Sequence, residues 1–213
     1  MSDDIFDTRF EGKNIDLDDN FVNLGDDINL TEKDPALRNV LLGAGWDLNA
    51  FNADALDLDL SLFLLNKNGQ TRHDPDFIFY NQPEGLEGGI KHHGDSRTGA
   101  GDGDDENITV DLQAVPFDIV QIMITITIYK GYEKQQNLDM VRNAYIRLVN
   151  GDTKQELCRF RIDKVLEDKE ETGVLIGAIN REGPKWHFAP MAEFVPGGLG
   201  EIARRYGHII NQE

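Results

Sequence analysis

Glycines and carboxylic acids alternate over one stretch in the middle of the sequence, Gly94-Asp-Ser-Arg-Thr-Gly-Ala-Gly-Asp-Gly-Asp-Asp-Glu106. Its acids are Asp95, Asp102, Asp104, Asp105 and Glu106. Glycine tolerates positive φ, so such a loop can turn carbonyl oxygens inward. Carboxylates held this close repel one another, at a cost in free energy, unless a cation lies among them or all of them point to water. Hard cations such as calcium take about six to eight oxygen ligands, so the stretch predicts either a cation-binding loop or a solvated acidic loop.

A second acidic group lies at the start of an apolar segment, Leu56-Asp-Leu-Asp-Leu-Ser-Leu-Phe-Leu-Leu65. If this segment is a strand, its side chains alternate between two faces, and Asp57 and Asp59 share one of them. The residues that continue that face, Phe63 and Leu65, are apolar, so the aspartates sit at the end of a buried strand. We expect them to chelate a cation together or to be solvated there. Asp47, after Gly-Trp, could lie at the same rim.

Other chemistries find little support. The acidic loop is not an EF-hand, because glycines interrupt its acids, and no Gly-Lys-Ser/Thr follows it to bind phosphate. His92 and His93 are neighbours, so in a strand they face opposite ways and cannot share one metal. Neither a Gly-x-Ser-x-Gly elbow nor a His-Glu-x-x-His helix occurs, and no aromatic-lined cleft accompanies the carboxylates for glycoside hydrolysis. We therefore predict no catalytic residue.

The composition narrows the function classes. The chain has 213 residues and a net charge of −18, which favours one domain and argues against nucleic-acid or anionic-lipid binding. The single cysteine, Cys158, permits neither an internal disulfide nor a thiolate metal cage, and we expect it in the core. The first residues lack a basic and apolar signal, and no apolar run reaches membrane-spanning length. We expect a cytoplasmic protein without membrane insertion.

The elements that must position these acids are mostly strands. Ile119–Tyr129 is rich in β-branched residues and predicts a central strand buried on both faces. Asn-Gly at 68–69 follows the aspartate strand and is typical of a hairpin turn. Further strands are predicted at 38–46, 56–65, 77–80, 108–112, 140–149, 156–162, 173–180 and 186–189. Residues 199–206 have helical periodicity that ends at Gly207.

These elements predict an antiparallel β-sandwich of two sheets with a short C-terminal helix. We place this domain at residues 26–213. Residues 1–25 form an acidic leader, for which the sequence leaves two possibilities open: a disordered segment or an added strand.

Several segments together resemble the TerD family of bacterial tellurite-resistance and general stress proteins. They are Leu42-Gly-Ala-Gly-Trp-Asp47, Asp57-Leu-Asp-Leu-Ser61, Asp76-Phe-Ile-Phe-Tyr-Asn81, His93-Gly-Asp-Ser-Arg-Thr-Gly99, Gly103-Asp-Asp-Glu106 and Val141-Arg-Asn-Ala-Tyr-Ile-Arg147. The resemblance covers roughly residues 26–210 in order. It implies a cytoplasmic β-sandwich that binds calcium, is not an enzyme, and takes part in resistance to tellurite, phage, colicins, and DNA-damaging and oxidative stress.

Carried over by position, the resemblance implies a set of metal ligands. These are Asp57, Asp59, Asp95, Asp102, Asp104, Asp105 and Glu106, with Asp47 as a ligand or a group supporting one. The leading hypothesis is a non-enzymatic calcium protein whose loop, fixed by the ion, contacts other stress-resistance proteins at the cytoplasmic side of the membrane. The alternatives are a metal-dependent hydrolase that uses the same carboxylates and a calcium-assisted carbohydrate-binding module.

Overall fold

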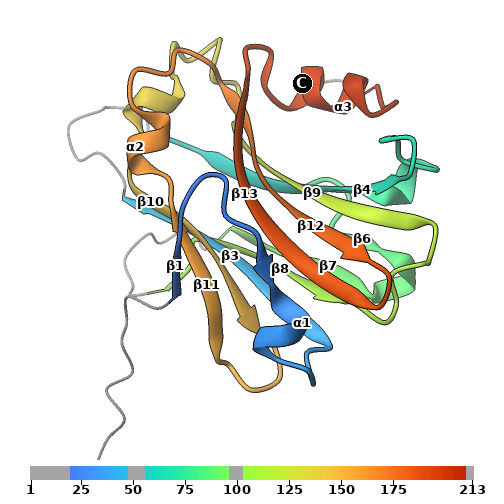
Figure 1. The fold of residues 1–213 in the computed structure, drawn as a ribbon. Helices are drawn as coiled ribbons and strands as arrows, with labels where there is room; N and C mark the ends of the chain where they lie inside the picture. The colour runs from blue at the N-terminus through green and yellow to red at the C-terminus, as the bar shows by residue number, and fades with distance from the viewer. Residues whose placement is uncertain (1–19, 48–55, 96–102, 210–213) are drawn as a thin grey trace, which may run out of the picture.

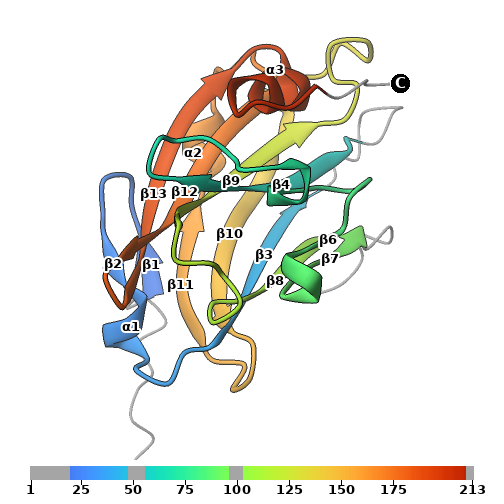
Figure 2. The same ribbon diagram turned by 90° about the vertical axis from the view of Figure 1, so that its right-hand side faces the viewer.

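A computed structural model describes residues 20–47, 56–95 and 103–209 (Figure 1). Two β-sheets pack face to face, and short helices lie at their ends (Figures 1 and 2). Sheet A contains β1 (Phe21–Val22), β11 (Glu156–Arg161), β10 (Arg142–Asn150), β3 (Asn39–Asp47), β8 (Glu106–Asp111), β7 (Ile90–Asp95) and β6 (Glu84–Gly85), in that spatial order. Sheet B contains β2 (Ile28–Asn29), β13 (Lys185–Val195), β12 (Gly173–Glu182), β9 (Ile119–Ile128), β4 (Leu58–Asn66) and β5 (Phe77–Ile78).

The predicted sandwich is confirmed. Every strand pair is antiparallel except β1 with β11, which is parallel. The described helices are α1 (Leu30–Lys33), α2 (Asp163–Leu166), α3 (Gly198–Arg205) and the 3-10 turns η2 (Asp74–Asp76), η3 (Leu86–Gly88) and η4 (Leu138–Met140). Segments far apart in the chain meet at one edge of each sheet, because the edge strand β1 pairs with β11 and the edge strand β2 pairs with β13.

Strand alternation produces the main core between the sheets. Leu58, Leu60, Leu62 and Leu64 of β4 turn inward and join the large buried cluster that fills this space. The opposite face of β4 carries Asp59, Ser61, Phe63 and Leu65, as the period of two predicts. The central strand β9 lies between β12 and β4, and every residue from Ile122 to Ile128 is buried, which confirms its predicted place.

Helix α3 covers one end of the outer face of sheet B. Its Leu199, Ile202 and Ala203 form a second apolar cluster with Phe63 and Leu65 of β4. Figure 2 shows α3 lying across one end of the sheet. The outer face of sheet B is therefore apolar where α3 covers it, whereas the outer face of sheet A carries Tyr145, Arg147 and Arg159.

Two local expectations need correction, and one open alternative is partly described. The Asn68-Gly69 turn forms, with the Gly69 amide donating to the Asn66 carbonyl at 2.9 Å, but the next strand begins only at Phe77, so it does not close a tight hairpin. The predicted strand at 77–80 ends at Ile78, because Phe79 and Gln82 exchange backbone hydrogen bonds across a turn. Of the predicted leader, Phe21–Val22 form β1, whereas residues 1–19 lie outside the described residues.

A buried ion pair secures the segment between β4 and β5. The side chain of Asp76 is fully buried and accepts hydrogen bonds from Arg72 Nε at 2.8 Å and Nη2 at 2.7 Å, and from the Arg72 amide at 2.9 Å. Burial alone would raise the pKa of the Asp76 carboxyl, but the hydrogen bonds and charge of Arg72 outweigh it and the pKa is lowered. The ionised form of Asp76 therefore stabilises the fold.

Arg72→Met leaves the buried Asp76 carboxylate without its cation, and we expect a loss of about 3–5 kcal/mol in unfolding free energy at neutral pH. Because the folded pKa of Asp76 is depressed, its contribution is present above the unfolded value of roughly 3.9 and disappears as pH falls through the folded value. The stability difference between wild type and Asp76→Asn should accordingly shrink below about pH 4. Urea unfolding at several pH values measures it. Glu170→Gln, at an exposed carboxylate on the surface, is the control and should show no such pH dependence.

Candidate metal centre

The edge of β4 is open at its first residues. The short strand β5 pairs only with Leu62 and Phe63, so within the described chain no strand pairs with Leu58–Ser61 on that side. Leu60 turns both of its backbone polar groups toward this edge, away from β9. Buried backbone groups need hydrogen-bond partners, so the open edge requires polar side chains from elsewhere.

Two side chains of sheet A supply those partners. A carboxylate oxygen of Glu106, the first residue of β8, accepts the Leu60 N–H. The Nε2 of His92, on β7, lies 3.1 Å from the Leu60 carbonyl. The Gly94 amide donates to His92 Nδ1 at 2.9 Å, which places the ring proton on Nε2 and makes Nε2 the donor to Leu60. Both histidine nitrogens are thus engaged, and the donors left to a cation here are oxygens.

The two predicted aspartates lie beside this edge. Asp57, Asp59 and Glu106 line one pocket of about 680 Å³, which we call the carboxylate pocket. Its other lining residues are Tyr80, Pro83, His92, His93, Gly94 and Tyr129. Asp59 is 9% exposed, whereas Asp57 is exposed. Burial raises the pKa of the Tyr80 phenol, and the charges of Asp59 and Asp57 raise it further, as expected where carboxylates gather.

Two further predicted ligands cannot be assigned. Asp95 ends β7 and its backbone pairs with Glu106, but its side chain lies outside the described part of the structure. Asp102 lies in the segment 96–102, which is also outside it. Asp57, Asp59 and Glu106 are therefore the predicted ligands that the structure brings together.

The structure places Asp104 on the other face of sheet A. Its side chain is 6% exposed and pairs with Arg147, at 2.8 Å from Oδ1 to Nε and 3.1 Å from Oδ2 to Nη2. The Tyr145 hydroxyl donates to Asp104 Oδ1 at 3.0 Å. Burial, then the charge and hydrogen bond of Asp104, raise the pKa of Tyr145 to about 12. Asp104 thus serves as an internal counter-ion on a surface away from the carboxylate pocket.

Two glycines of β3 make room for this arrangement. A Cβ at Gly43 would lie 2.0–2.7 Å from the Asp104 carboxylate, and one at Gly45 would lie 2.6–2.7 Å from the Tyr145 ring. Real Cβ atoms do not approach so closely, so both positions need glycine. The Gly-Ala-Gly segment at 43–45 therefore forms a shallow trough on the outer face of sheet A.

Arg147 extends the Asp104 contact into a chain of ion pairs. Its Nη1 donates to Glu156 at 3.2 Å, and Arg159 donates to the same carboxylate at 2.9 and 2.6 Å. We call Asp104, Arg147, Glu156 and Arg159 the ion-pair ladder. Two acids and two bases make it electrically neutral. Hydrogen bonds from both arginines outweigh the effect of burial and lower the pKa of Glu156.

Asp105 and Asp47 have different partners again. Asp105 Oδ2 accepts the Trp46 amide at 2.8 Å, and the Asp105 amide donates to the Ala44 carbonyl at 2.8 Å. Asp47, at the end of β3, accepts a hydrogen bond from the Asn143 side chain. Both residues fasten loop and strand ends of sheet A, and neither lines the carboxylate pocket.

The three gathered carboxylates do not form a finished metal centre. Within residues 20–47, 56–95 and 103–209, no three His, Cys, Asp or Glu side chains meet closely enough to hold an ion by themselves. The available donors are carboxylate oxygens without sulfur, the set that hard cations such as calcium prefer. The residues therefore fit an ion that completes its coordination with water or carbonyl oxygens.

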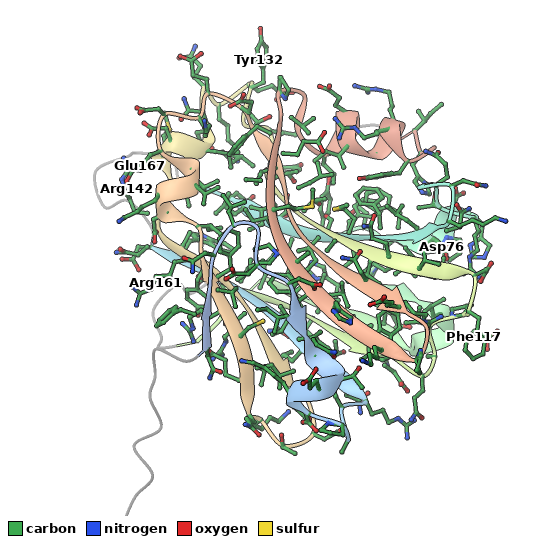
Figure 3. The ribbon with its side chains drawn as sticks, in the orientation of Figure 1. Asp76, Phe117, Tyr132, Arg142, Arg161 and Glu167 are labelled. Atoms are coloured by element: carbon green, nitrogen blue, oxygen red, sulfur yellow. The ribbon has the colours of Figure 1, made fainter. Side chains whose placement is uncertain are left out.

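A larger pocket, of about 940 Å³, lies on the outer face of sheet A. Arg159 stacks on Tyr145 and Arg161 on Phe21, with guanidinium-to-ring distances of 4.3 and 4.1 Å. Figure 3 shows Arg161 and Arg142 on the same side of the molecule. Glu156 and Asp163 line the same pocket, so it offers both charges and selects neither anion nor cation.

The sequence did not predict the role of His92. Its alternation with His93 was expected and is confirmed, since His92 is buried and His93 exposed. However, a histidine that satisfies a distant strand edge leaves no local pattern, because its partner Leu60 is 32 residues away. Tyr80 and Tyr129, which line the pocket, stand in strand-like sequence that gives no sign of a site.

Among the residues that the structure describes, every helix is too short or too polar to span a lipid bilayer.

Comparison with known proteins gives a consistent picture. A model of the TerD domain matches residues 21–206. General stress protein 16U of Bacillus subtilis (strain 168) is 42% identical over 184 residues, which cover 86% of this chain and 94% of that protein. Tellurium resistance protein TerD of Serratia marcescens is 39% identical over 183 residues, with the same two coverages.

A solved structure shares the fold. It is a homologue of telluride resistance protein (TerD) from Streptomyces coelicolor A3(2), with a TM-score of 0.61 and 18% identity. The match covers 77% of this chain and 94% of that one. At this identity it supports the sandwich architecture alone.

The trough on β3 generates a stability prediction. Gly43→Ala forces the Asp104 carboxylate away from Arg147 and Tyr145, and we expect a loss of about 2–4 kcal/mol in unfolding free energy. Gly103→Ala is the matched control, since its Cβ would meet nothing within 4 Å and Gly103 is not in the left-handed region. It should change stability by less than about 0.5 kcal/mol. Denaturant unfolding of both variants decides; equal losses would mean that the trough is not required.

Proposed function

The chain belongs to the TerD domain family, and from this premise we propose that it is a stress-response protein that binds calcium in the carboxylate pocket and acts without catalysis. The names of its relatives support the first part, since they are a tellurium resistance protein, a general stress protein and, over 63% of this chain, a chemical-damaging agent resistance protein. The residues of the carboxylate pocket support the second part, calcium binding.

One observation carries the calcium proposal. Asp57, Asp59 and Glu106 belong to two segments almost 50 residues apart in the sequence and to different sheets, yet they line one pocket. Grouped carboxylates repel one another and destabilise the folded state unless a cation compensates them. A bound calcium ion would supply that positive charge.

The chain's own groups define how an ion would be held. One oxygen of Glu106 accepts the Leu60 amide, which fixes the carboxylate at the wall of the pocket. Asp57 is exposed and Asp59 nearly buried, so together they offer oxygens at two depths. His92 contributes no nitrogen, because Leu60 and Gly94 engage both. These features favour an oxygen-seeking ion with flexible geometry.

We further propose that the occupied pocket presents a surface to other stress-resistance proteins at the cytoplasmic side of the membrane. Lys130 and Lys134 lie 5.5 and 5.2 Å from the centre of the Tyr129 ring, which lines the pocket. Tyr132, in the same loop, is 89% exposed and projects from the molecule (Figure 3). Cross-linking in cells with wild type and Tyr132→Ala, in calcium and in chelator, tests this part; identical cross-linking in all four cases would refute it.

A metal-dependent hydrolase that uses the same carboxylates is the second candidate. Such an enzyme needs a general base beside the ion. Of the two histidines that line the pocket, His92 donates to the Leu60 carbonyl and His93 Nε2 lies 3.0 Å from the Thr109 hydroxyl. We expect calcium to bind more tightly than magnesium, because magnesium demands a tight octahedron that flexible carboxylates do not impose. Calorimetric titration with each ion measures this. Equal or tighter magnesium binding would favour the hydrolase.

Calcium should also stabilise the fold measurably. An ion that binds only the folded state adds about 2.7 kcal/mol when its free concentration is roughly 100 times the dissociation constant. For a chain of this size the melting temperature should rise by roughly 5–10 °C. Asp59→Asn removes one charge at constant shape, so we expect a slightly more stable calcium-free protein and a smaller calcium-induced rise. Thermal unfolding in chelator and in excess calcium measures both effects.

Asp47→Asn is the matched control. Asp47 was a predicted ligand, but the structure pairs it with Asn143, so its calcium-induced rise should equal that of wild type. An unchanged rise in Asp59→Asn would remove Asp59 from the site. No rise in wild type would refute the calcium proposal.

A further inference from the structure

Three consecutive acids at the start of β8 face three different places. Asp104 reaches the outer face of sheet A and pairs with Arg147. Asp105 bonds the β3 backbone at Trp46 and Ala44. Glu106 turns inward to Leu60 and the carboxylate pocket. Residues 104–106 are therefore fixed on both faces of sheet A. On the outer face Asp104 belongs to the ion-pair ladder, and on the inner face Glu106 belongs to the carboxylate pocket.

Of these contacts, the one made by Asp104 has the strongest geometry. Its carboxylate receives two hydrogen bonds from one guanidinium and a third from the Tyr145 hydroxyl, at 2.8, 3.1 and 3.0 Å. Fork-to-fork arginine–carboxylate pairs fix orientation as well as distance. The arginine is itself held by Glu156, and Glu156 by Arg159, so the ladder leaves Arg147 little freedom to move. Asp104 is therefore a fixed point two residues before Glu106.

We propose that the ion-pair ladder positions Glu106 for cation binding from the opposite face of sheet A, with Asp104 as a positioning residue and not a ligand. This inference rests on the proposed calcium function for its affinity consequence, although the positioning itself does not need the ion. Groups that orient metal ligands commonly change affinity about 10- to 100-fold when they are removed. The ladder would therefore set calcium affinity without touching the ion.

The rival assignment makes Asp104 a ligand, and the two assignments predict opposite effects of Arg147→Met. If Asp104 positions Glu106, Asp104→Asn and Arg147→Met should each weaken calcium binding about tenfold. The double variant should be no weaker than either single one, because both remove the same contact. If Asp104 is a ligand, Arg147→Met releases a carboxylate toward the ion, and calcium binding should tighten or stay the same.

The same strand offers a matched control. Asp111, the last residue of β8, pairs with Arg38 at 3.2 Å, at the end of the strand away from Glu106. Arg38→Met removes an arginine from an ion pair with β8 but leaves the ladder intact. Its calcium affinity, measured by calorimetry beside the ladder variants, should equal that of wild type. A similar loss in Arg38→Met would mean that any weakening of β8 suffices, and it would overturn the specific role of Asp104.

A measurement in chelator separates this inference from the calcium proposal. The Leu60 amide donates to Glu106, so its hydrogen exchange reports whether Glu106 stays in place. We expect exchange at Leu60, relative to that at Ile124 in the buried strand β9, to rise about tenfold in Asp104→Asn and Arg147→Met and to stay unchanged in Arg38→Met. Taking the ratio to Ile124 cancels general destabilisation. An unchanged Leu60-to-Ile124 ratio in Asp104→Asn and Arg147→Met would refute the positioning role. If that ratio rises but calorimetry detects no calcium binding to wild type, only the calcium proposal is refuted.

Discussion

The structure depends on how the open edge of β4 is closed. A strand that ends its pairing early leaves an N–H and a carbonyl exposed, and buried groups of this kind cost free energy unless they are bonded. Here the partners come from the facing sheet, since Glu106 takes the Leu60 N–H and His92 bonds its carbonyl. This places a carboxylate beside Asp57 and Asp59. The same contact therefore joins the sheets at this edge and brings together the acids available to a cation.

Strands β3 and β8 make this closure possible because residues on both of their faces make packing contacts. Inward, Leu42, Ala44, Ile108 and Val110 fill the core between the sheets. Outward, the trough at Gly43 and Gly45 accepts Asp104 and Tyr145, which lie flat against the sheet. An ordinary side chain at either glycine would lift them away. Acids of one stretch thus have different roles because they point to different faces of sheet A. Asp104 is a structural counter-ion and Glu106 a candidate ligand, although a single residue separates them.

The fold was accessible from the sequence because period-two alternation and β-branched runs are local signals. They located β3, β4, β9, β10, β11 and β12, the face shared by Asp57 and Asp59, and the buried face of α3. The division of the acids was not accessible. Asp104, Asp105 and Asp47 have the composition of ligands, but their partners Arg147, Trp46 and Asn143 are 43, 59 and 96 residues away. The role of His92 was hidden for the same reason. Which oxygens remain available to an ion is decided by long-range contacts that no local pattern encodes.

The late position in the sequence of β13 and α3, which complete sheet B, has a consequence for synthesis on the ribosome. Ile28 pairs with Phe188, and the apolar part of the outer face of sheet B is covered only when residues 198–205 arrive. A nascent chain must therefore carry Phe63, Leu65 and Met123 uncovered until residues 198–205 have been translated. Non-local pairing of this kind slows folding and prolongs the exposure of apolar strands. We expect chains that terminate before α3 to be substrates of chaperones and proteases, because the apolar residues that α3 covers would stay exposed.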